Sequence, residues 1–77
     1  MERFGERLRM IRLSKGLTQS EAAAYCKLKG VSGMSKKEHF SQYERGVRYP
    51  NTKTLYAICI GLGVSADYLL GLREMEE

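Results

Sequence analysis

The chain has 77 residues, of which 43% are hydrophobic, 29% are charged and one is proline, and its net charge is +4. This length and composition suit one small domain, residues 1–77, with a modest core, and they exclude a disordered chain. No apolar run approaches the ~20 residues that cross a bilayer, and the N-terminus lacks the apolar stretch of a secretion signal, so we expect a cytoplasmic protein with no membrane partner.

Two helices are predicted in the first third of the chain. Apolar residues at helical spacing predict a helix over residues 3–15, ended by Gly16. Thr18, with Glu21 three residues later, forms a capping box that starts a second helix. We expect this second helix to end near Gly30, since a glycine commonly stops a helix.

The rest of the chain predicts three further helices. Ser35 with Glu38 makes a second capping box, and Gly46 ends the helix that follows. A fourth helix is expected between Asn51 and Gly63, and a short fifth helix over residues 65–70. No segment shows β-alternation. The predicted fold is therefore all-α, a compact arrangement of five short helices.

The third predicted helix has two contrasting sides. Phe40 and Tyr43 lie three residues apart and are expected to face inward. The opposite side carries polar groups of varied length: Lys37, Glu38, Ser41, Gln42 and Arg45. Such a side chain set suits contact with base edges in a major groove, where donors and acceptors are read. The alternative is an ordinary solvated helix face.

The charges are concentrated in the middle of the chain. Residues 27–53 carry seven Lys or Arg against two Glu, whereas residues 54–77 carry one Arg against four acidic residues. A basic middle followed by a short acidic tail favours an anionic partner such as nucleic acid.

The remaining chemistry argues against a metal centre or an enzyme. Cys26 and Cys59 fall at apolar helical positions, so we expect reduced thiols in the interior. One histidine and two distant cysteines do not supply a metal site, and we expect no cofactor. There is no paired acid and base constellation and no glycine-rich phosphate loop before a strand.

Three stretches resemble one family when they are read together. The sequences "FGERLRMIRLSKGLTQ", "HFSQYERGVRYPNTKTL" and "GLGVSADYLLG" are similar to the lambda-repressor-like, Cro/XRE-type helix-turn-helix domain. The resemblance covers residues 4–71. It implies a sequence-specific double-stranded DNA-binding transcriptional regulator, a repressor of prokaryotic or phage origin, with the helix of residues 36–45 in the major groove of an operator.

The resemblance also assigns roles to individual residues. It implies an ion pair between Arg12 and Glu44 that ties the first helix to the third. The base-reading residues would be Lys37, Glu38, Gln42 and His39, of which His39 could instead contact phosphate. The phosphate-binding residues would be Gln19, Thr18, Lys36, Arg45, Arg48 and Lys53.

The chain departs from the family pattern in the connection between helices two and three, which is several residues longer. Part of the excess is expected to lengthen helix two by about a turn. Lys27 and Lys29 would then be exposed, and we expect solvated lysines, with additional phosphate contacts as the alternative. Met10 and Leu13 are apolar where the family has polar residues, and we expect them to pack under the longer loop, with packing against a partner as the alternative.

Near the end of the chain, Tyr68 and Leu72 resemble the patch through which such domains form a two-fold dimer. A dimer would set two reading helices about 34 Å apart on a palindromic operator. Ordinary core packing is the alternative for both residues. The rival function is a protein–protein interaction module on the same fold, such as an antitoxin or an adaptor.

Overall fold

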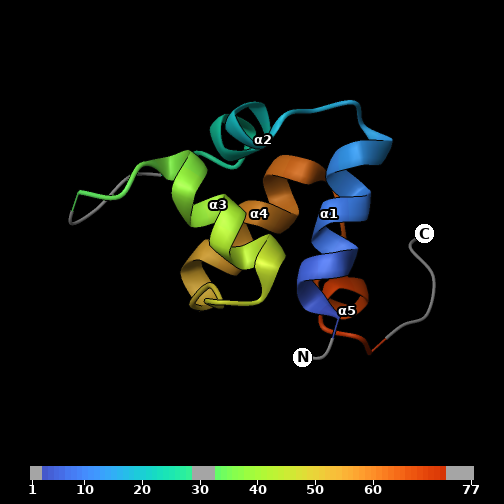
Figure 1. Ribbon diagram of the computed structural model, residues 1–77. Coiled ribbons are helices and arrows are strands. Elements are labelled where there is room, and N and C mark those ends of the chain that lie inside the picture. Colours follow the sequence, from blue (N-terminus) through green and yellow to red (C-terminus); the bar gives the residue numbers. More distant parts are fainter. Residues whose placement is uncertain (1–2, 29–32, 73–77) are drawn as a thin grey trace.

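The computed structural model describes residues 3–28 and 33–72, which form five α-helices (Figure 1). The helices are α1 (Phe4–Ser14), α2 (Gln19–Tyr25), α3 (Lys36–Arg45), α4 (Thr52–Leu62) and α5 (Ala66–Leu69). α3 packs against both α1 and α2, α2 packs against α4, and α5 contacts α1 and α4. The predicted all-α fold of five short helices is confirmed. None of the helices described is long and apolar enough to span a bilayer.

Four of the five helices begin where a capping residue was predicted. Each cap accepts a hydrogen bond from the backbone N–H three residues further on: Thr18, Ser35, Asn51 and Ser65. The capping box of α2 is complete, because the Thr18 N–H also donates to Glu21 Oε1 at 2.8 Å. The box expected at α3 is only half formed. The Glu38 carboxylate lies 4.0 Å from Arg45 Nη2 and does not turn back to Ser35.

The prediction that α2 runs to Gly30 is wrong, because the helix ends at Tyr25. Lys27 takes a left-handed conformation with φ of 56°, and the Leu28 N–H then donates to the Ala23 carbonyl at 3.1 Å. This closing turn carries Leu28 against the hydrophobic core, where a continued helix would not have placed it. Gly30 itself lies outside the described residues.

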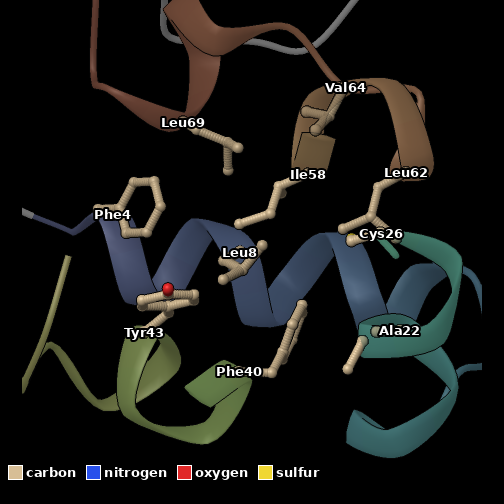
Figure 2. Packing of buried hydrophobic residues seen from close by; sticks show 11 residues of the cluster. Phe4, Leu8, Ala22, Cys26, Phe40, Tyr43, Ile58, Leu62, Val64 and Leu69 are labelled. Carbon is tan, nitrogen blue, oxygen red and sulfur yellow. The ribbon is translucent and has the colours of Figure 1, made fainter. Parts of the chain in front are cut away.

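All five helices contribute side chains to one core (Figure 2). Phe4 and Leu8 of α1 lie between Phe40 of α3 on one side and Ile58 and Leu69 on the other. Each of these side chains is at most 1% exposed, and burying one such side chain contributes about 1.5–3 kcal/mol. The core therefore holds α3 firmly enough for its other side to serve as a surface.

Neither cysteine forms a disulfide within the described residues, and the expected interior position holds for Cys26, which is buried, whereas Cys59 is only half-buried. Cys26 is 1% exposed, and burial raises the pKa of its thiol to about 12. A thiol with so high a pKa remains protonated and unreactive at neutral pH. Cys26 is a packing residue at the end of α2.

Gly5 sets the distance between α1 and α3. A Cβ atom at this position would collide with the Glu44 carbonyl oxygen and lie 2.8 Å from that of Tyr43. Only glycine permits so close an approach of the two helices. The C-terminal turn of α3 is therefore seated directly on the first turn of α1.

Candidate nucleic-acid interface

A buried ion pair holds the C-terminal end of α3 against α1. Arg12 Nε donates to Glu44 Oε2 at 2.6 Å, and Arg12 Nη2 donates to Glu44 Oε1 at 3.2 Å. The two side chains are only 10% and 3% exposed. Arg12 Nη1 also donates to the Leu17 carbonyl at 2.9 Å, and Gln19 Nε2 donates to Glu44 Oε1 at 3.1 Å. The network therefore joins the end of α1, the start of α2 and the end of α3.

Gln19 belongs to this network and is also one of the predicted phosphate contacts. The resemblance assigns Gln19 to phosphate, and the structure uses one of its two amide N–H donors on Glu44. The second donor remains for another acceptor. Thr18 is more fully occupied, because its hydroxyl accepts from Glu21 N and its own N–H donates to the Glu21 carboxylate.

The side of α3 that faces away from the core forms what we term the reading face. It consists of Lys37, Glu38, Ser41, Gln42 and Arg45, all exposed or half-buried. Arg45 Nε donates to Ser41 Oγ at 3.3 Å, and its Nη2 lies 4.0 Å from Glu38. The reading face offers hydrogen-bond donors and acceptors and no large apolar group, as base-edge recognition requires.

The turn after α3 folds back onto Gln42. Gly46 has a φ of 73°, a left-handed conformation that glycine adopts without strain. The N–H groups of Val47 and Arg48 then both point to the Gln42 carbonyl, at 3.0 Å and 3.4 Å. In the same place, Arg48 Nε donates to Gln42 Oε1 at 2.9 Å. The sequence did not predict this contact, which joins an expected phosphate contact to an expected base reader.

His39 does not lie with the other predicted base readers. It lines a hollow of about 510 Å³ between α3, the start of α4 and the end of α2. Its ring lies 6.5 Å from that of Tyr43, and its Nε2 is buried with no hydrogen-bond partner among the described residues. His39 therefore lies on the side of α3 that faces α4. Burial raises the pKa of the neighbouring Tyr43, an effect that the nearby charge of Arg48 partly offsets.

Most of the predicted phosphate contacts flank the reading face. Lys36, Arg48 and Lys53 lie beside it, Arg45 belongs to it, and all four are exposed. Arg48 and Lys53 line the same hollow as His39, and Lys27 joins them there from the end of α2. Lys29, the other lysine of the longer connection, lies outside the described residues. No carboxylate lines this hollow within the part of the chain described, so it is a basic concavity beside α3.

The two residues expected at a dimer contact differ in their surroundings. Tyr68 is half-buried, with the Arg7 guanidinium 4.8 Å from its ring centroid and Arg7 Nη1 donating to its carbonyl at 3.2 Å. Leu72 is 75% exposed. The Tyr68 ring therefore has a cationic partner within the chain, whereas the Leu72 side chain is largely exposed.

Several apolar side chains are exposed away from the reading face. Met10 and Leu13 are 62% and 50% exposed, so the expectation that they pack under the connection between α2 and α3 is wrong. The described parts of that connection leave the fold on the side of α3 away from α1 (Figure 1).

A further exposed apolar group was missed from the sequence. Tyr25, Tyr56 and Ile60 are 61%, 69% and 66% exposed. Tyr25 and Ile60 line a second hollow of about 370 Å³. The available signal was their position on α4: Tyr56 and Ile60 are four residues apart and share one face, and each lies two residues from the buried Ile58, so that face is not the buried one.

Comparison with known proteins places the chain in a family. A family model for helix-turn-helix proteins matches residues 8–69. The chain belongs to the Cro/C1-type helix-turn-helix family. The resemblance drawn from the sequence motifs is therefore confirmed.

Two curated relatives carry the same family description in their names. The SPbeta prophage-derived uncharacterized HTH-type transcriptional regulator YonR of Bacillus subtilis (strain 168) is 39% identical over 67 residues, covering 87% of this chain and 56% of that protein. The HTH-type transcriptional regulator ImmR of the same organism is 37% identical over 74 residues, covering 96% of this chain and 53% of that protein. The chain thus spans about half the length of these relatives. No solved structure matches it.

Within the described residues, no group of three or more His, Cys, Asp or Glu side chains is arranged to hold a metal ion.

Proposed function

We propose that this protein is a sequence-specific DNA-binding transcriptional regulator that inserts α3 into the major groove of an operator. The observation that carries the proposal is the contrast between the two sides of α3. One side is fixed by the bidentate Arg12–Glu44 pair, and the other presents the exposed polar reading face. A rigid helix with a hydrophilic outer side is what major-groove recognition needs. The relatives, both named HTH-type transcriptional regulators, support the same role.

The base contacts are assigned to three residues of the reading face. Lys37 donates to guanine acceptors, Gln42 to a purine or thymine acceptor, and Glu38 accepts from cytosine N4. Glu38 is available for this because its carboxylate does not cap α3. We assign His39 to the DNA phosphate backbone instead of a base, because it lines the basic hollow.

Phosphate contacts surround these base contacts. Lys36, Arg45, Arg48 and Lys53 supply exposed positive charge on the flanks of α3. Gln19 supplies its second amide donor at the start of α2, and Thr18 lies beside it. Such contacts fix the register of α3 on the duplex without reading sequence.

We further propose that the regulator is a cytoplasmic repressor of prokaryotic or phage origin that binds as a homodimer to a palindromic operator. Occupying the operator would suffice for repression. The prophage origin in the name of one relative supports the phage assignment. Leu72, 75% exposed near the end of α5, is the better placed of the two expected dimer contacts.

The test is selection of binding sites from random duplexes, followed by titration of the selected site at several salt concentrations. We expect one preferred sequence and an affinity that falls with salt, with a log–log slope of about −0.9 per phosphate neutralised. A scrambled duplex of equal length is the control. Equal affinity for both duplexes would refute sequence-specific regulation.

A protein-interaction role, as an antitoxin or adaptor, is the second candidate. It is favoured by the exposed apolar side chains Tyr25, Tyr56 and Ile60, which lie away from the reading face. If this role were the main one, Tyr56→Ser would abolish function in cells while leaving DNA affinity unchanged.

A further inference from the structure

We propose that Arg48 is a positioning residue that determines which atoms of Gln42 are presented to the base edges. The inference rests on the proposed function, because it concerns how the reading face selects a base. It adds a specificity role to a residue that charge alone would place only on a phosphate.

The backbone brings the two residues together. The left-handed Gly46 reverses the chain, so that the N–H groups of Val47 and Arg48 both approach the Gln42 carbonyl. Arg48 is thereby held beside Gln42 by main-chain geometry. Its Nε then donates to Gln42 Oε1 at 2.9 Å without a long reach.

The chemistry of the two groups sets the orientation of the amide. A guanidinium carries only donors, whereas the glutamine amide has an oxygen acceptor at one end and an NH₂ donor at the other. Only the oxygen can face Arg48 favourably. Gln42 Nε2 must therefore point away from Arg48 and offer its N–H donors to a partner.

A fixed Nε2 donor selects among bases. It can donate to N7 or O6 of guanine, N7 of adenine or O4 of thymine, and it meets the N4 amino donor of cytosine unfavourably. Without Arg48, the amide is free to rotate and to present oxygen instead. The base pair that Gln42 contacts would then be read less strictly.

Arg48 also links this base contact to the DNA backbone. Its Nε–H is used on Gln42, while the two Nη groups hold four further N–H donors. A phosphate bound by these groups would fix the guanidinium and, through it, the Gln42 amide. Loss of Arg48 should therefore affect both affinity and base preference.

The contact can be tested first in the free protein by NMR. We expect the Arg48 Nε–H to exchange with water more slowly than that of the exposed Arg9, and its signal to shift in Gln42→Ala. Exchange as fast as in Arg9, together with no change in Gln42→Ala, would overturn the proposal. This readout needs no DNA.

The specificity role is then tested on the duplex that the wild-type chain selects, with each base pair varied in turn. We expect Gln42→Ala and Arg48→Ala to flatten preference at the same base pair, by roughly fivefold or more, and the double variant to flatten it no further. Lys53→Ala is the matched control, because Lys53 is also cationic and exposed on this flank. It should weaken all duplexes equally.

The outcomes are distinct. If Arg48→Ala lowers affinity but keeps the wild-type base preference, as expected for Lys53→Ala, Arg48 is a phosphate contact only and the proposal is refuted. If the wild-type chain selects no sequence, the proposed function has failed and the reading role of Arg48 falls with it. The NMR experiment still decides in that case whether the two side chains are paired.

Discussion

Two carboxylate–guanidinium pairs involve residues of α3, one on each side of it, and they differ in almost every physical respect. Glu44 and Arg12 are 3% and 10% exposed and joined by two hydrogen bonds, the shorter of 2.6 Å. Glu38 and Arg45 are 55% and 56% exposed, with 4.0 Å between the nearest charged atoms. The first pair is desolvated and geometrically fixed, and the second is solvated and loose.

The two pairs therefore have different roles within one short helix. A buried bidentate pair cannot be broken without leaving a charge in the interior, so it fixes the helix. An exposed pair contributes little to stability, so its members remain available to a partner at little cost. Burial and hydrogen bonding, more than the types of residue, decide which duty a charged pair serves.

The largest expected effect comes from breaking the buried pair. Arg12→Ala leaves the Glu44 carboxylate buried with the Gln19 amide as its remaining side-chain partner among the described residues, and we expect a loss of about 3–5 kcal/mol in the free energy of unfolding. Urea denaturation followed by circular dichroism measures it. Arg9→Ala is the control, because Arg9 is exposed on the same helix and should change stability by less than about 0.5 kcal/mol.

The same substitution should also weaken DNA binding under conditions where the variant is folded, because α3 loses the contact that fixes its C-terminal end. Titration of the selected duplex measures the change. An unchanged melting temperature for Arg12→Ala would show that the pair does not hold α3.

A large effect on binding with almost none on folding is expected on the outer side. Lys37→Ala should leave the free energy of unfolding within about 0.5 kcal/mol of wild type, since the side chain is exposed. It should cost about 1–3 kcal/mol in DNA affinity and relax preference at one base pair. Competition titrations with single-base variants measure both. A uniform loss across all duplexes would place Lys37 on a phosphate instead.

Local signals account for the parts of the fold that could be predicted from the sequence. A capping residue and the N–H three positions away interact within a single turn, so Thr18, Ser35 and Asn51 mark helix starts without reference to the rest of the chain. The end of α2 is different. It is set where Leu28 meets the core and where Tyr25 lies against Gly61 of α4, contacts that no local pattern reveals.

The candidate site likewise has parts that could be predicted from the sequence and parts that could not. The Arg12–Glu44 pair followed from the family resemblance, and the polar side of α3 followed from helical spacing. The direction of His39 did not, because it lies at the edge between the inner and outer sides and only the position of α4 decides which way it faces. The Gln42–Arg48 contact depends on the reversal at Gly46 and could be seen only in three dimensions.

Gln19 lies between the buried ion pair and the exposed surface. Its substitution should have a smaller effect than those above on both the free energy of unfolding and the affinity for DNA. Gln19→Ala removes one half-buried hydrogen bond to Glu44, and we expect a loss of about 1 kcal/mol in the free energy of unfolding. If its second donor binds phosphate, affinity should fall equally for all duplexes. Gln19→Glu is a useful companion variant, because it keeps the size of the side chain but places a carboxylate beside Glu44 and the phosphate. A change in base preference in Gln19→Ala would contradict a backbone role.

The smallest expected effect sharpens the comparison most directly. A double-mutant cycle between Glu38→Gln and Arg45→Ala should give a coupling energy below about 0.5 kcal/mol in unfolding measurements, because both side chains are more than half exposed. The equivalent cycle at Arg12 and Glu44 should give a coupling several times larger. If the outer cycle matched the inner one, burial would not be what distinguishes the two pairs, and the reading face would be held as rigidly as the inner side. If instead the coupling between Glu38 and Arg45 is weak and decreases further with added salt, each side chain can leave the other and contact a base or a phosphate.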